Sequence, residues 1–203
     1  MRDAKRALDL LGAAGGLILL GPLLAVIAGL TWLLMGRPVL YRQRRSGKDR
    51  RPFQILKFRT MRPGAGSDAE RLTRLGRVLR RTSLDELPEL SNVLLGEMSL
   101  VGPRPLPTRY VERYTPRQAR RHEVRPGLTG WAQVNGRNLL SWEERLELDV
   151  WYVDHWSFGL DLRILARTIG DTMSGRGIRH PDSATMPEFA GTKAPAGAPE
   201  KDR

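Results

Sequence analysis

One short segment of the chain places two adjacent carboxylates just before a proline. It runs from Thr82 to Gly96 and holds the pair Asp85-Glu86, with Pro88 following two residues later. Proline is favoured in the first turn of a helix, so the pattern predicts a helix that begins near Pro88 and ends at Gly96. Carboxylates at the positive end of a helix dipole stay ionised. An ionised aspartate can act as a nucleophile, and a neighbouring glutamate can hold a divalent cation.

The same residues allow a purely structural interpretation. Ser83 and Glu86 have the spacing of a capping box, in which Asp85 is an ordinary acidic residue of the first helical turn. The spacing by itself favours this alternative, so the choice depends on what the other segments supply.

Three further segments carry groups that bind anions or admit a ligand closely. Two prolines flank Arg104 and restrict its backbone, which suits presentation of a guanidinium to a phosphate. Alternation along a predicted strand puts Lys57 and Arg59 on one face. Gln133 lies in the glycine-rich segment 125–138, where the backbone can approach a ligand. Each pattern also occurs in turns and solvated faces, but together they supply the parts of phosphoryl transfer.

Composition and charge exclude several kinds of site. The 203-residue chain has no cysteine, which excludes disulfides, thiolate metal sites and a cysteine nucleophile. Its three histidines lie far apart in sequence, which argues against a histidine metal site. Residues 37–125 hold 22 basic and 9 acidic side chains, and this block accounts for the net charge of +12. Such a block attracts phosphorylated substrates, anionic headgroups or nucleic acid.

The elements that must position these groups begin with an apolar segment. Residues 10–35 form a run of 26 residues without a charge. At about 1.5 Å per residue such a run can cross a hydrocarbon core roughly 30 Å thick. Basic residues flank it on both sides, unlike most spanning helices, and Pro22 after Gly21 removes one hydrogen bond and kinks the axis. These features favour a re-entrant membrane helix, with a simple kinked spanning helix as the alternative.

The remainder predicts a small α+β domain that is mainly helical. Segments 38–43 and 53–61 have strand patterns around a turn signal, which indicates a short β-hairpin. A capping box at residue 67 opens the first of three segments with helical spacing, which are 67–79, 141–156 and 161–174. The apolar stripe and the aromatic residues of the last two segments fit either core packing or contact with a membrane surface.

Four motifs, in this order, resemble the bacterial sugar-transferase family, the monotopic polyprenyl-phosphate phosphoglycosyl transferases. They are Lys-Phe-Arg-Thr-Met at 57–61, Thr-Ser-Leu-Asp-Glu-Leu-Pro at 82–88, Met-Ser-Leu-Val-Gly-Pro-Arg-Pro at 98–105 and Arg-Pro-Gly-Leu-Thr-Gly-Trp-Ala-Gln-Val-Asn-Gly-Arg at 125–137. The similarity extends from about residue 3 to residue 191. The length is that of the small single-module members.

The resemblance implies an enzyme that moves a phosphosugar from a UDP-sugar to undecaprenyl phosphate. In the family an aspartate takes the phosphosugar and releases UMP. The polyprenyl phosphate then attacks the covalent intermediate and leaves as polyprenyl diphosphosugar. On this chain Asp85 resembles the nucleophile and Glu86 the ligand of Mg²⁺. The motifs do not specify which sugar is transferred.

The resemblance also implies a set of substrate-binding residues. Arg104 resembles the phosphate-binding arginine of the Pro-Arg-Pro loop, and Arg80 matches another active-site arginine. Asp161 matches a further acidic position. Three more residues lie within the motifs and are expected among the substrate-binding groups, namely Lys57, Arg59 and Gln133.

The family resemblance implies a re-entrant helix broken at a Ser-Pro pair, with both ends on the cytoplasmic face of the bacterial inner membrane. Gly21-Pro22 stands in that place here and lacks the serine hydroxyl. We therefore expect a membrane helix over 1–36, a cytosolic catalytic domain over 37–191 and a disordered tail over 192–203. The expected partners are the donor, the lipid acceptor and membrane phospholipids, without nucleic acid.

A hypothesis of another class is a membrane-tethered basic protein that binds nucleic acid or a partner without catalysis. It would use the basic block, but it leaves the Asp85-Glu86 pair without a task, and the sequence carries no helix-turn-helix or RNA-binding signature.

Overall fold

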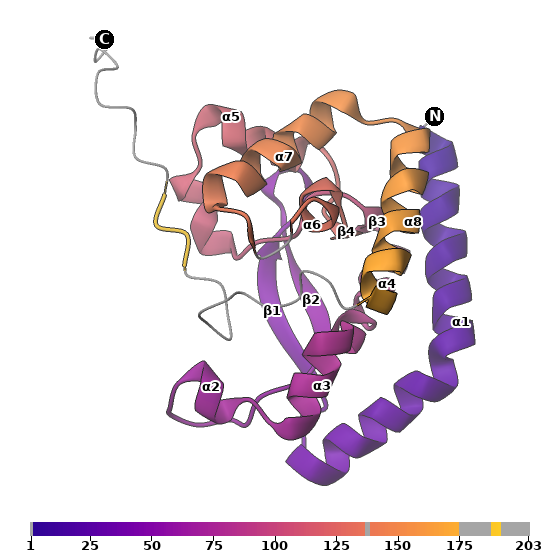
Figure 1. Cartoon of the computed structure of the whole chain (residues 1–203), viewed down its shortest axis with the longest axis vertical. Coiled ribbons are helices and arrows are strands. Elements are labelled where there is room, and N and C mark those ends of the chain that lie inside the picture. Colours follow the sequence, from indigo (N-terminus) through magenta and orange to yellow (C-terminus); the bar gives the residue numbers. More distant parts are fainter. Residues whose placement is uncertain (1, 137–138, 175–187, 192–203) are drawn as a thin grey trace.

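The computed structural model describes residues 2–136, 139–174 and 188–191, so the predicted tail over 192–203 lies outside the described residues. Figure 1 shows a long helix, α1 (Arg2–Met35), along one side of a mainly helical body that contains two small sheets. The predicted α+β class, mainly helical with a short hairpin, is confirmed.

The body contains the following elements in chain order: β1 (Leu40–Ser46), η1 (Lys48–Arg50), β2 (Pro52–Phe58), α2 (Asp68–Arg71), α3 (Arg74–Thr82), η2 (Leu84–Glu86), α4 (Glu89–Leu95), β3 (Ser99–Val101), η3 (Thr108–Arg113), α5 (Pro116–Ala119), η4 (Arg120–Glu123), β4 (Gly127–Thr129), α6 (Trp131–Val134), α7 (Trp142–His155) and α8 (Phe158–Ser174). The η elements are 3₁₀ turns. Strands β1 and β2 pair antiparallel, and β3 and β4 pair parallel.

The predicted hairpin is present, but its strands begin and end a few residues away from the predicted positions. Its register runs from Leu40 opposite Phe58 to Ser46 opposite Pro52. The predicted strand residues 38–39 and 59–61 fall outside it. The chain after β2 turns toward α3 instead, where Gly76 packs so closely that a Cβ would lie 2.0 Å from the carbonyl oxygen of Thr60.

The predicted helix over 67–79 is wrong in one respect, because it is two helices. The capping box between Ser67 and Glu70 is present, but α2 ends after four residues. Leu72 leaves the helix to bridge Met61, and Thr73 then caps α3 by accepting a 2.9 Å bond from the Gly76 N–H. Threonine side chains compete with helical hydrogen bonds in this way. The second predicted segment, 141–156, corresponds to α7, which begins after a capping box at Ser141.

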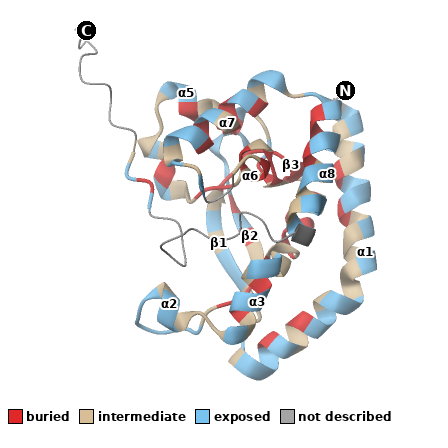
Figure 2. Cartoon of the chain, in the orientation of Figure 1, coloured by how far each residue is buried: buried red, intermediate tan, exposed pale blue. Residues whose placement is uncertain are grey.

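Helix α1 is continuous through Pro22 and bends about halfway along its length (Figure 1). The proline explains the bend, because it removes a backbone donor inside the helix. By length and composition α1 is able to cross a membrane, and only 11% of its most apolar window is buried in the protein. Figure 2 shows the same: most of α1 is coloured exposed or intermediate. Packing in the body therefore does not explain its hydrophobicity.

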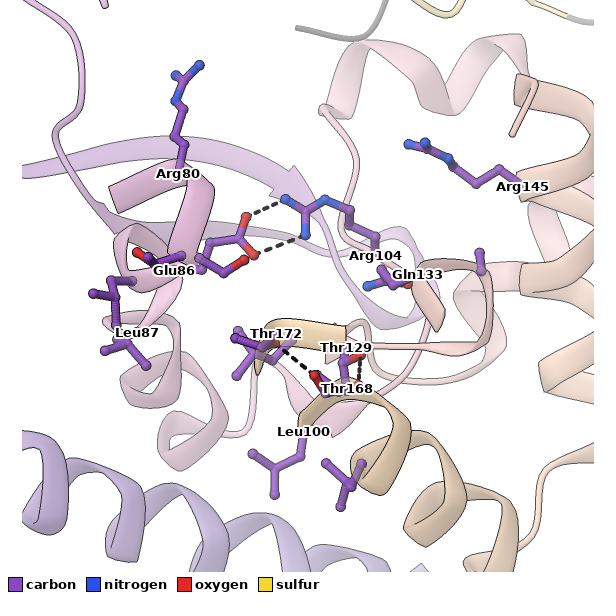
Figure 3. A pocket seen from close by; sticks show the side chains of 16 residues that line it. Arg80, Glu86, Leu87, Leu100, Arg104, Thr129, Gln133, Arg145, Thr168 and Thr172 are labelled. Atoms are coloured by element: carbon purple, nitrogen blue, oxygen red, sulfur yellow. Dashed lines mark hydrogen bonds and ion pairs between the residues drawn. The ribbon is translucent and has the colours of Figure 1, made fainter. Parts of the chain in front are cut away.

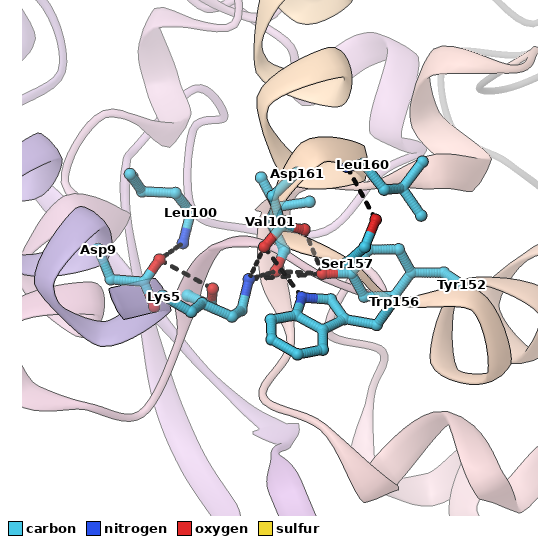
Figure 4. A network of polar contacts seen from close by, with 10 residues as sticks. Lys5, Asp9, Leu100, Val101, Tyr152, Trp156, Ser157, Leu160 and Asp161 are labelled. Carbon is cyan, nitrogen blue, oxygen red and sulfur yellow. Dashed lines mark hydrogen bonds and ion pairs between the residues drawn. The ribbon is translucent and has the colours of Figure 1, made fainter. Parts of the chain in front are cut away.

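Polar contacts tie the first turns of α1 to the body (Figure 4). The buried Asp9 carboxylate accepts bonds from Ser99 Oγ at 2.9 Å and from the Leu100 N–H at 2.8 Å, both on β3. Arg6 donates to the Val93 carbonyl at 2.8 Å, near the C-terminal end of α4, where a cation is favoured. Gly12 allows α1 to pack closely on β3, since a Cβ there would lie 2.6 Å from the Leu100 side chain.

A buried carboxylate joins α1 to α7 and α8. Asp161 is fully buried and accepts three bonds: 2.6 Å from Lys5 Nζ, 2.7 Å from the Tyr152 hydroxyl and 3.0 Å from Trp156 Nε1. Its negative charge is thus compensated by one cation and two neutral donors, which a buried carboxylate requires. Burial, followed by Asp161, raises the pKa of Tyr152, so the hydroxyl keeps its proton.

The apolar residues of α8 do not form one core stripe. Ile164 is fully buried and Leu165 packs against the core, whereas Leu162 and Ile169 are 46% and 63% exposed. On α7 the neighbouring aromatic residues divide likewise: Tyr152 is buried, and Trp151 stacks on Trp131 with ring centroids 4.9 Å apart.

We predict that Asp161→Asn strongly destabilises the protein, because Lys5 would keep its charge without a counterion. Loss of one partner of a buried pair costs roughly 3–5 kcal/mol. Thermal unfolding of the detergent-held protein measures this. Asp154→Asn is the matched control, since its pair with Arg120 is at the surface and such pairs contribute about 0–1 kcal/mol. Equal melting temperatures for the two variants would contradict the assigned role of Asp161.

Candidate active site

Two cavities adjoin in the body. The larger has a volume of about 1140 Å³ and is lined by the hairpin, α3, η2 and the loop after β3. The smaller, about 380 Å³, is lined by η2, the strands β3 and β4, α6 and α8 (Figure 3). Their linings share five residues, and these mark where the cavities meet: Arg80, Ser83, Glu86, Arg104 and Arg145.

Glu86 lies at this junction between two cations. Lys57 Nζ of β2 is 2.6 Å from its Oε1, and Arg104 contacts both carboxylate oxygens, with Nη1 3.3 Å from Oε2. Burial alone would raise the pKa of Glu86, but Arg104 and Lys57 outweigh it and hold that pKa far below its ordinary value. Glu86 is therefore ionised.

The capping box weighed for Ser83 and Glu86 is absent. Ser83 makes no side-chain cap bond and has a φ of 57°, in the left-handed region, where it ends α3. The Glu86 side chain is occupied by the two cations instead. The purely structural interpretation of this segment is thereby corrected. Helix α4 begins at Glu89 with Pro88 before it and ends at Gly96, with a φ of 82°, close to the prediction.

Asp85 is buried in η2, one turn before α4, and borders the larger cavity. The groups around Asp85 act on its carboxyl in two opposite directions. Burial, and then the neighbouring Glu86, raise the pKa of Asp85, while Lys57, Arg80 and Arg104 oppose the rise. Asp85 is thus a mostly buried carboxyl group beside several cations, where an electrophilic phosphorus would meet a poorly solvated oxygen.

A buried ion pair fixes the backbone of Arg104. Its carbonyl oxygen accepts a 2.6 Å bond from Arg121, whose guanidinium also pairs with Asp149 at 2.8 Å. Both Arg121 and Asp149 are almost completely buried. Together with the flanking prolines, this pair fixes the loop, so that the guanidinium of Arg104 can face the cavity at little entropic cost.

The other predicted site residues separate into two groups. Arg80 lines both cavities, and its Nε donates to Thr60 Oγ1 at 3.0 Å. Gln133 lines the smaller cavity. Arg59 borders the larger cavity, but its guanidinium donates to the carbonyls that end α1, including that of Gly36 at 2.6 Å. Asp161 lines neither cavity, since it is enclosed in the buried network described above.

Sequence reasoning missed Arg145, which lies at the junction, and Glu89, which contacts Lys57 but lines neither cavity. Glu89 is buried 3.1 Å from Lys57, and burial raises its pKa to about 7. Its position three residues after Glu86, one helical turn on, was an available signal. Arg145 of α7 lines both cavities, and burial followed by Arg104 lowers its pKa to about 10. No local pattern points to it.

The larger cavity is strongly cationic. Besides Lys57, Arg80, Arg104 and Arg145, its lining includes seven further arginines: Arg45, Arg59, Arg62, Arg71, Arg77, Arg81 and Arg109. Four acidic residues also line it: Asp68, Asp85, Glu86 and Glu188. This excess of guanidinium groups suits a ligand with several negative charges, such as a diphosphate.

Comparison with known proteins gives matches that cover most of the chain. EpsL of Bacillus subtilis, an uncharacterized sugar transferase, is 48% identical over 93% of this chain and 96% of its own length. The UDP-glucose:undecaprenyl-phosphate glucose-1-phosphate transferase of Caulobacter vibrioides is 43% identical over 81% of the chain and 68% of its length. The Escherichia coli protein of that name is 42% identical over 83% of the chain, which spans only 40% of that relative.

The model of the bacterial sugar transferase family matches residues 1–175, a range that includes α1 and every residue at the junction of the two cavities. With that coverage and the similarity to EpsL, the chain belongs to the bacterial sugar transferase family and is a transferase enzyme.

Proposed function

We propose that this protein transfers a phosphosugar from a UDP-sugar to undecaprenyl phosphate, through a covalent intermediate on Asp85. The observation that carries the proposal is the placement of Asp85, a buried carboxylate beside Glu86 in a cavity lined by guanidinium groups. The names of the Caulobacter and Escherichia coli relatives supply the donor and acceptor classes.

The proposed reaction has two displacements at one phosphorus atom. A carboxylate oxygen of Asp85 attacks the phosphorus that carries the sugar, and the bond from that phosphorus to the bridging oxygen breaks, so that UMP leaves. An oxygen of the lipid phosphate then attacks the same phosphorus and releases Asp85 as a free carboxylate. Arg104 and Arg80 are placed to neutralise charge on the transferred group.

The acidic residues at the junction suit Mg²⁺. Among the described residues, no three or more His, Cys, Asp or Glu side chains lie close enough together to hold a metal ion by themselves. Mg²⁺ is commonly bound by one or two carboxylates together with water and substrate phosphates. Glu86 fits, because its Oε2 takes one long bond of 3.3 Å and keeps lone pairs. We therefore propose Glu86 as the ligand; the bound ion would neutralise charge on the diphosphate.

We also propose that α1 lies in the bacterial inner membrane as a re-entrant helix, with the cavities on the cytoplasmic side. The support is the bend in α1 and its outward apolar side chains, among them Leu11, Ile18, Leu19, Leu33 and Leu34, which are 62–80% exposed. An anchor of this kind would keep the cavities close to the headgroups, where the phosphate of a lipid acceptor lies.

We predict that Asp85→Asn abolishes UMP release with the fold intact. The amide cannot attack phosphorus, and since burial disfavours the carboxylate, the neutral isostere should leave the melting temperature unchanged or higher. The measurement is UMP release and intact mass with Mg²⁺ and a UDP-sugar, without acceptor. The unsubstituted protein should gain the mass of one phosphosugar. Asp154→Asn, a surface change of the same kind, should react normally; turnover in Asp85→Asn would remove Asp85 from the nucleophile role.

Arg104→Ala should raise the KM for the UDP-sugar by roughly 10–100-fold, because it removes a charge-assisted fork facing the diphosphate. Steady-state kinetics at saturating acceptor checks this. Arg120→Ala removes the same charge from a surface pair and should change KM less than about twofold. An unaltered KM in Arg104→Ala would refute the assignment.

A further inference from the structure

The smaller cavity contains a buried amide that no protein group satisfies. Both polar atoms of the Gln133 carboxamide are buried, and neither has a hydrogen-bond partner among the described residues. Other buried amides of the protein are satisfied. Asn92, for example, accepts from the Leu56 N–H at 3.1 Å and donates to the Gln54 carbonyl at 2.8 Å. Because a buried unpaired amide is costly, Gln133 calls for a ligand.

The neighbours of Gln133 define the chemistry of that ligand. Thr129 and Thr168 hydroxyl oxygens are 2.7 Å apart, and Thr168 donates to the Ile164 carbonyl at 2.8 Å, so the shared bond uses the Thr129 proton. Both oxygens keep lone pairs and act as acceptors toward a ligand. Gln133 offers both donors and acceptors. The wall also has an apolar part, made of Leu84, Leu87, Leu100, Leu128, Ala132 and Leu165, and its charged residues lie where it meets the larger cavity (Figure 3).

This mixture matches a sugar ring better than a polyprenyl chain. A pyranose carries hydroxyl groups at its edge and C–H groups on its faces, so it pairs with the amide and also packs on leucine. An isoprene unit has no hydrogen-bonding atom, and it would shut Gln133 away from water without a partner, which is the costliest arrangement. The volume of about 380 Å³ lies at the lower end of ligand pockets, roughly 300–1,000 Å³, as suits a monosaccharide.

The smaller cavity also lies next to Asp85, where the transferred phosphosugar would be held. Leu84 and Glu86, the residues on either side of Asp85, both line it, and Arg80 and Arg104 border it as well as the larger cavity. A phosphosugar held at Asp85 therefore lies at its mouth, and the nucleotide is left with the larger, cationic cavity.

We propose that the smaller cavity receives the sugar of the donor, and that Gln133 selects among sugars by hydrogen bonds to the ring substituents. This rests on the proposed function, and it assigns a role to a residue that touches neither the nucleotide nor the reacting carboxylate. The neighbouring Gly130 leaves room for the amide, since a Cβ there would lie 2.8 Å from Gln133 Oε1.

The test uses the full chain with Asp85→Asn, which binds donor without turnover. Calorimetry gives the dissociation constants of UDP, UDP-glucose, UDP-galactose and UDP-N-acetylglucosamine, and the ratio of the UDP constant to each UDP-sugar constant measures the sugar contribution. Adding Gln133→Leu should reduce the largest ratio about tenfold, the effect of one lost hydrogen-bonding group, with UDP affinity unchanged. Adding Gln54→Leu, an exposed glutamine on β2 outside both cavities, should change nothing.

A second readout separates recognition from a structural role. Replacing an unpaired buried amide by leucine should leave the melting temperature unchanged or raise it, whereas a structural glutamine would lower it. Gln133→Glu keeps the shape but replaces the N–H donors, so it should alter the order of preference among the sugars.

Three results would overturn the proposal. One is an unchanged set of sugar ratios in Gln133→Leu. Another, in the chain with Asp85 intact, is normal UMP release by Gln133→Leu with a raised KM for undecaprenyl phosphate, which would give the cavity to the lipid. If the chain binds neither UDP nor any UDP-sugar, the proposed function itself fails, and the role of Gln133 fails with it.

Discussion

The Glu86 carboxylate is shared by two cations from distant parts of the chain, Lys57 in the hairpin and Arg104 in the loop after β3. A buried carboxylate is tolerated only with such partners, so the hairpin, η2 and the loop must close around it together. The converse holds in part, because Glu86 compensates the charge of Arg104, whereas Lys57 also pairs with Glu89. An arriving diphosphate then competes with Glu86 for Arg104 and enters a site whose charges are already balanced.

The elements around this cluster are fixed by contacts that leave little freedom. Gly76 lets α3 approach the chain after β2, which brings Arg80 to Thr60. The Arg121–Asp149 pair holds the backbone of Arg104, so a ligand can move its guanidinium but not its loop. Holding the loop in this way limits the rearrangement that Arg104 needs as charge develops, which favours electrostatic catalysis.

Sequence reasoning found the groups whose chemistry can be predicted from a local motif. The Asp85-Glu86 pair, the proline-flanked Arg104 and the capping box at Ser67 each depend on residues a few positions apart. The roles set by distant contacts were not accessible. Nothing near Asp161 reveals that its partner is Lys5, 156 residues away, or that this contact encloses it outside both cavities.

The same limit explains why the surroundings of Asp85 and Arg59 were not accessible from the sequence. A helix dipole near Asp85 can be read from spacing, but the burial that raises its pKa arises from packing. Arg59 follows directly after β2, and its guanidinium donates to the carbonyls of Met35 and Gly36, more than twenty residues earlier in the chain. The family resemblance supplied a role for Asp85 and marked Arg59 only as a member of a motif.

The way α1 joins the body has a practical consequence for preparing a water-soluble form. Its first turns supply the partners of the Leu100 N–H and Asp161, and they cover the Leu100 side chain through Gly12. Deleting the helix would leave polar groups unpaired and core leucines bare. Solubility has to be sought instead by replacing outward leucines such as Leu11 and Leu19 with polar residues, so that the helix remains as a structural part of the domain.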